Sequence, residues 1–144
     1  MNQRSDPGHG VPTAPHPVLN AMLICDLAIR EEGTGKVSLI GIFENIGASQ
    51  FPISQRLCVY VKLVDAEGEY EIRLELVRIE DLQILGQGQF RGTFQDRMTP
   101  AEIAFDLALS FDRPGRYEFR LHANNKWVAS KSFSVVQVAP PGAP

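Results

Sequence analysis

The stretch EYEIRLELV, residues 69–77, decides the fold class because apolar and charged side chains alternate along it. The even-numbered residues from Tyr70 to Leu76 are apolar, and the odd-numbered residues from Glu69 to Glu75 are charged. A period of two is typical of a strand with one face in the core and the other in water. The segment therefore predicts a sheet that packs one side against a second layer.

Period-two patterning continues on both sides of this stretch, and turns rich in glycine or proline separate the segments. We expect strands, the last of them single or divided, over residues 19–30, 37–46, 56–64, 69–77, 82–90, 101–111, 117–125 and 127–138. Short strands at this spacing predict an all-β, antiparallel, immunoglobulin-like β-sandwich of seven to eight strands. A closed barrel is the alternative. Gly86 and Gly88 loosen one strand and suit a bulge or a sheet edge.

The chain length of 144 residues fits one domain with two tails. Residues 1–17 are rich in Pro, Gly and His and predict a disordered tail, residues 18–138 form the β-sandwich domain, and residues 139–144 are a disordered Pro-rich tail. A net charge of −3 with interleaved basic residues disfavours nucleic acid as a partner.

We expect a cytoplasmic protein with no membrane contact. The first residues lack the apolar core of a signal peptide, and no apolar run approaches the ~18 residues of a membrane span. Cys25 and Cys58 lie in apolar strand-like runs, so we interpret them as buried free thiols in a reducing compartment.

No sequence motif predicts a catalytic, cofactor-binding or metal-binding site. GTGK, residues 33–36, resembles the end of a phosphate loop, but it joins two strands and does not feed a helix N-terminus. An enzymatic or ligand-binding site would rest on Asp26, Asp106 and His122, and at least two of these residues would have to converge in a pocket.

A carbohydrate-binding module is a related alternative, and it would need exposed aromatic side chains. Trp127 is the single tryptophan, and Tyr60 is the most plausible outward tyrosine. The sequence therefore gives this function little support.

The first two predicted strands depart from clean alternation because both of their faces are apolar. We interpret Leu23 to Ile29, at odd positions, as the core face of the first strand, with Met22 and Ile24 on its other face. If the strands pair as a hairpin, one outer patch is formed by Met22, Ile24, Ile40 and Ile42, with Phe51 at its border. Apolar patches of this kind mark contacts, so we predict a non-enzymatic protein–protein interaction or assembly module.

Three coverings of this patch stay open. The loop GASQFPISQ, residues 47–55, with Phe51 and Ile53, folds back over it; or a second copy forms a homo-oligomer; or a different protein binds there. Gly41 fits each of them, because a residue without Cβ lets a neighbouring side chain approach the backbone.

The segments LNAMLICDLAIREEGTGKVSLIGIFENI, followed by FP, and RPGRYEFRLHANNKWVASKSFSV together resemble a family of small bacterial proteins of uncharacterised function. The resemblance covers about Val18 to Val138. It implies an immunoglobulin-like β-sandwich and brings no catalytic or ligand-binding residues to this chain.

Overall fold

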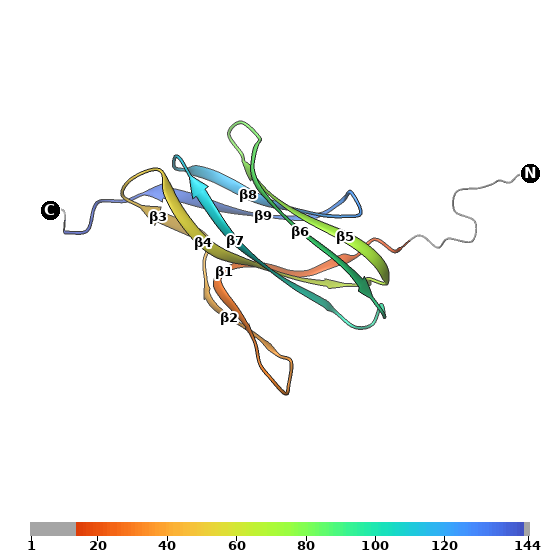
Figure 1. Cartoon of the computed structure of the whole chain (residues 1–144). Helices are drawn as coiled ribbons and strands as arrows, with labels where there is room; N and C mark the ends of the chain where they lie inside the picture. Colours follow the sequence, from red (N-terminus) through yellow and green to blue (C-terminus); the bar gives the residue numbers. More distant parts are fainter. Residues whose placement is uncertain (1–13, 143–144) are drawn as a thin grey trace, which may run out of the picture.

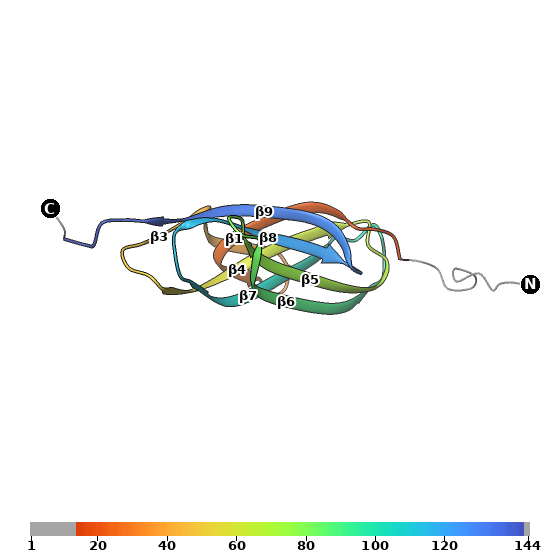
Figure 2. The ribbon, with the colours of Figure 1, turned by 90° about the horizontal axis from the view of Figure 1, so that it is seen from above.

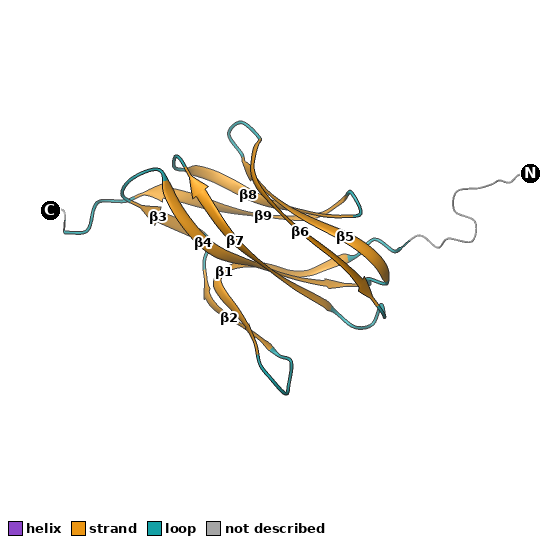
Figure 3. Cartoon of the chain, viewed as in Figure 1, coloured by secondary structure: helices purple, strands orange, loops and turns teal. Residues whose placement is uncertain are grey.

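The computed structural model describes residues 14–142, which form nine strands in two facing sheets (Figures 1 and 3). The strands are β1 (Val18–Arg30), β2 (Val37–Ile42), β3 (Asn45–Ala48), β4 (Ile53–Val64), β5 (Gly68–Arg78), β6 (Gln83–Phe94), β7 (Ala101–Phe111), β8 (Gly115–Ala123) and β9 (Lys126–Gln137). No helix occurs between residues 14 and 142. Most of the predicted N-terminal tail and the last two residues lie outside the described part of the chain. Ala14, the first described residue, packs against the core.

Sheet A has the strand order β2-β1-β4-β7, and sheet B has the order β3-β9-β8-β5-β6. Figure 2 shows the two layers from above. The predicted two-layer, all-β architecture is confirmed, with two corrections. There are nine strands instead of seven to eight, and the β3–β9 pair is parallel. The sequence 37–46, predicted as one strand, divides between β2 in sheet A and β3 in sheet B.

The core between the sheets is centred on packed aromatic rings. Tyr117 and Phe119 of β8 lie against Phe133 of β9, with ring centroids 5.8 and 5.3 Å apart. Phe111 of β7 meets Tyr117 edge-on at 5.0 Å, an arrangement that aromatic quadrupoles favour. Phe111, Tyr117 and Phe119 are all fully buried, so these rings form the centre of the core.

The two sheets approach closely where their edge strands β6 and β7 meet. An ideal Cβ on Gly86 would lie 3.2 Å from Leu109, and one on Gly88 would lie 3.2 Å from Phe105. The β5–β6 register also shifts between Leu76 and Val77, opposite Gly86. Both the bulge and the sheet edge predicted for these glycines are therefore present, and the missing side chains let the sheets close.

β1 takes part in two different structures along its length. Its first residues pair with β4 as far as Cys25, whereas its last residues pair only with β2. We call this second part the arm: residues 26–42, comprising the end of β1, the turn and β2. Figure 1 shows the arm projecting below both sheets.

Gly41 sits where the arm leaves the sheet, and its φ of +69° lies in the region that favours glycine. A Cβ at this position would fall 2.2 Å from Asp26 Oδ2. The side chain that lies close to Gly41 is therefore Asp26 of the same hairpin, and not a residue of the loop 47–55.

Candidate functional site

The arm lies against the outer face of sheet A. Cys25, Cys58 and Tyr60 point away from the core, yet all three are buried. The Cys25 thiol donates to the carbonyl oxygen of Leu27 over 3.6 Å, which places the arm's backbone beside that thiol. The chain therefore covers part of the second apolar face of β1 and β4 with its own hairpin.

Arg30 and Tyr60 converge on one carboxylate and hold the arm against the sheet. Arg30 Nη1 lies 3.5 Å from Glu102 Oε1, and the Tyr60 hydroxyl donates to Glu102 Oε2. Burial, reinforced by the bonded Glu102 carboxylate, raises the pKa of Tyr60 to about 12. Between arm and sheet remains a small cavity of about 70 Å³, lined in part by Val37 and Ala104.

The opposite face of the arm is apolar and exposed. Leu27 of β1 pairs directly with Ile40 of β2, and their side chains are 47% and 50% exposed. Ile29 and Ile42 extend the same face, at 43% and 55% exposed. We call these four residues the apolar face of the arm.

The structure separates the five residues of the predicted patch. Met22 and Ile24 lie in the core between the sheets, so the prediction that they face outward is wrong. Phe51 is partly buried and packs against the core. Ile40 and Ile42 alone of the predicted set lie on the exposed surface.

β1 contributes Leu27 and Ile29 to the exposed apolar face of the arm, instead of Met22 and Ile24. We predicted both for the core face of β1, but alternation cannot say which of two apolar faces points inward. The missing signal was the bend after Cys25, beyond which β1 leaves the sandwich. Asp26 beside an opposing Gly41 is the one local feature that marks this position.

Cys25 and Cys58 are directly opposed in the β1–β4 pair and are both free, as predicted. Burial raises the pKa of Cys58 to about 12, and the neighbouring Cys25 adds to the shift. Burial also raises the pKa of Cys25. Because the thiolate is the reactive form, both groups are poor nucleophiles at neutral pH.

The predicted acid–base residues do not assemble into one site. Asp106 lies on the outer face of sheet A, opposite Cys58. His122 lies on sheet B, opposite Arg73 and Trp127, so the sandwich separates it from Asp106. Asp26 packs over Gly41. Among residues 14–142, no group of three or more His, Cys, Asp or Glu side chains is placed to hold a metal ion.

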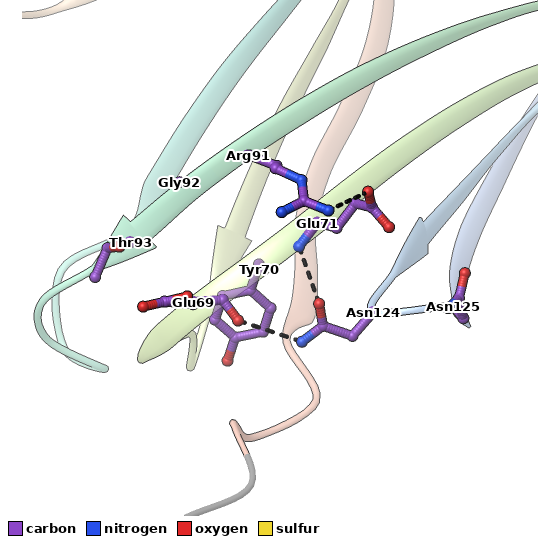
Figure 4. A pocket seen from close by; sticks show the side chains of 8 residues that line it. All are labelled: Glu69, Tyr70, Glu71, Arg91, Gly92, Thr93, Asn124 and Asn125. Atoms are coloured by element: carbon purple, nitrogen blue, oxygen red, sulfur yellow. Dashed lines mark hydrogen bonds and ion pairs between the residues drawn. The ribbon is translucent and has the colours of Figure 1, made fainter.

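A hollow of about 590 Å³ is an open groove at the end of sheet B (Figure 4). Most of its polar groups form hydrogen bonds or ion pairs with one another. Arg91 pairs with Glu71 at 3.0 Å, and Asn124 accepts from the Glu71 amide at 2.9 Å and donates to the Glu69 carbonyl at 3.3 Å. These bonds stabilise the turns that form the groove. Few of its polar groups therefore remain free to bind a ligand.

The aromatic residues considered for carbohydrate binding are also separated. Trp127 is 59% exposed on sheet B, whereas Tyr60, on the opposite sheet, is covered by the arm. Tyr70 and Tyr117 are buried as well. Tyr60 therefore faces outward as predicted, but it offers no stacking surface.

The chain belongs to a family of unknown function, DUF6941, whose model matches residues 20–136. No curated protein matches the chain. The family match covers β1 almost entirely, the whole of the arm and the sandwich as far as β9. Residues 14–142 contain no helix that is long and apolar enough to cross a membrane.

Proposed function

We propose that the protein is a non-enzymatic protein–protein interaction or assembly module that binds through the apolar face of its arm. The observation that carries this proposal is the exposure of Leu27, Ile29, Ile40 and Ile42 on one side of a projecting hairpin. The opposite side of that hairpin is fastened to sheet A through Arg30 and Glu102.

The four side chains of the apolar face would gain free energy if a partner buried them. Full burial of one aliphatic side chain is worth about 1.5–3 kcal/mol. Each of the four side chains is about half exposed, so roughly half of that free energy is available to a partner from each. The fastened side gives the hairpin a defined orientation, which lowers the entropic cost of binding.

The test is affinity capture with tagged protein from extracts of the source cells. Leu27→Asp and Ile40→Asp place charge on the apolar face and should abolish capture. Leu82→Asp is the matched control, because Leu82 is an exposed aliphatic residue in the β5–β6 turn. Proteins retained equally by all variants would contradict the proposal.

An immunoglobulin-like relationship is part of the proposal. Its support is the Greek-key arrangement of two sheets, together with a tyrosine near the start of β8 whose hydroxyl bonds to the backbone at a corner. In this comparison the arm is an addition between the first strand and the parallel β3–β9 pair. Location in the cytoplasm, expected from the sequence, also belongs to the proposal.

A carbohydrate or other small-molecule ligand on sheet B is the second candidate. Trp127 supports it as an exposed ring beside His122, whose Nδ1 is buried without a hydrogen-bond partner among the described residues. Titration of soluble oligosaccharides while recording Trp127 fluorescence tests it. An unchanged spectrum for every sugar class would remove this candidate.

A further inference from the structure

We propose that the partner of the arm is a second copy of this chain, bound by antiparallel pairing of β2 with β2 across a two-fold axis at Ile40. This inference rests on the proposed function, because it names the partner of the same apolar face. It adds a backbone contact that the apolar face alone does not require.

β2 forms an uncharged edge of sheet A. An edge strand exposes unpaired N–H and C=O groups, and natural proteins protect such edges with charges, short strands or covers. β2 is one of four edge strands, and its sequence, VSLIGI, contains no charged residue.

The other three edges are protected. β3 is only four residues long. β6 carries Arg91, and β7 carries Glu102 and Asp106. β2 is therefore the edge of the described fold that is best suited to pairing with another strand.

β2 is complementary to a second copy of itself. Two identical strands pair antiparallel around a two-fold axis, which gives a closed dimer. With Ile40 on the axis, the Ile40 side chains of the two copies lie opposite each other. Four apolar side chains then form one row across the joined sheet: Leu27 and Ile40 of one copy, followed by Ile40 and Leu27 of the other. Directly opposed side chains on one face of an antiparallel pair are about 4.5–5.5 Å apart, so these aliphatic groups would bury one another.

The charged residues on either side of β2 are also complementary between two copies. Lys36 precedes β2 and Glu44 follows it, each four residues from Ile40. Glu44 lies beyond the end of β2, so the proposed register brings Lys36 of each copy near Glu44 of the other without pairing their backbones. Glu44 is exposed and lies 3.6 Å from Lys131 of its own chain, so one carboxylate would bind two ammonium groups.

The contact is small by the standards of stable dimers. A standard interface buries about 800 Å² of each partner, whereas this one joins six-residue strands and four half-exposed side chains from each copy. We therefore expect a dimer that dissociates on dilution.

Cysteine substitution locates the axis. Ile40→Cys should form an intermolecular disulfide under oxidised glutathione, with the two thiol protons and two electrons passing to that oxidant. Leu27→Cys is the matched control, because it lies on the same face one strand farther from the axis. Two Leu27 positions would be roughly three strand spacings, about 14 Å, apart, beyond the ~7 Å limit of a disulfide.

Charge exchange tests the register. Light scattering over a wide concentration range should show a monomer–dimer equilibrium, and either Lys36→Glu or Glu44→Lys should raise the dissociation constant several-fold. An equimolar mixture of the two variants should restore dimers, since each mixed pair again joins opposite charges.

Three outcomes would overturn the inference. They are a monomer at every concentration, equal cross-linking of both cysteine variants, or no recovery on mixing. If the monomer still captures a different protein through its apolar face, the proposed function stands and only the self-pairing fails. If Leu27→Asp changes neither the proteins that are captured nor the molar mass measured by light scattering, both proposals fail.

Discussion

The hydroxyl of Tyr117 donates to the carbonyl oxygen of Arg113 across 2.6 Å and closes the turn between β7 and β8. The ring of Tyr117 is fully buried between Phe111 and Phe133. One side chain therefore joins the aromatic core to the backbone of a surface turn.

Tyr117→Phe should lower the free energy of unfolding by about 0.5–1.5 kcal/mol, because it removes one hydrogen bond and keeps the ring. Urea unfolding should show a lower midpoint with an unchanged m-value. A midpoint equal to that of the wild type would mean that this bond contributes nothing to stability.

Gly41→Ala should destabilise the arm through two effects. A non-glycine residue in the left-handed region costs roughly 1–2 kcal/mol, and the new Cβ would collide with Asp26. Gly35→Ala is the control, since Gly35 has a φ of +72° with open space around its Cβ position. Hydrogen exchange of the β2 amides should accelerate more for Gly41→Ala than for Gly35→Ala.

Replacement of Asp26 by Ala in the Gly41→Ala background should recover the part of the loss that comes from the collision. If the double variant exchanges as fast as Gly41→Ala alone, backbone strain is the whole effect and the contact with Asp26 is unimportant.

Asp81 should stabilise the fold above pH 4 and lose this contribution in acid. Two hydrogen bonds from the Arg78 guanidinium, at 3.1 and 2.9 Å, hold the pKa of Asp81 at about 2, below its ordinary value of 3.8. A carboxylate with a lowered pKa stabilises the folded state above its unfolded pKa, and the contribution disappears as the pH falls through the folded pKa.

The urea midpoint of the wild type should therefore exceed that of Asp81→Asn at about pH 5, and the difference should shrink towards about pH 2. A difference that stays constant over this range would show that Asp81 does not act through its charge.

Cys25 and Cys58 should resist a disulfide reagent such as DTNB in the folded protein at pH 8. Both thiols are buried, and the pKa of Cys58 is about 12, so little thiolate is present. Both should react at once in urea. Rapid reaction of the native protein would mean that the arm opens readily, and Gly41→Ala should increase the rate if the arm is the cover.

The sequence predicts the sandwich best where only one face of a strand is apolar. Ile72, Leu74 and Leu76 of β5 lie in the core as their alternation requires. In β1 both faces are apolar, so the alternation does not show which face points into the core. The choice depends on the bend after Cys25, a tertiary feature that the alternation of apolar residues does not encode.

The parallel β3–β9 pair was also beyond prediction. β3 contains four residues, NIGA, and it follows β2 with only Phe43 and Glu44 between them. A segment this short carries no periodicity of its own. Its pairing depends on β9, which lies about ninety residues later in the chain.

The chain enters and leaves the arm at almost the same point, because the amide of Phe43 donates to the carbonyl of Ile24 over 2.9 Å. The seventeen residues of the arm (26–42) are thus an insert whose two ends are already joined by a hydrogen bond. A shorter or longer hairpin grafted between Cys25 and Phe43 would leave the core strand pairings in place. If the proposed function holds, exchanging such inserts would change the binding partner while the core strand pairings stay the same.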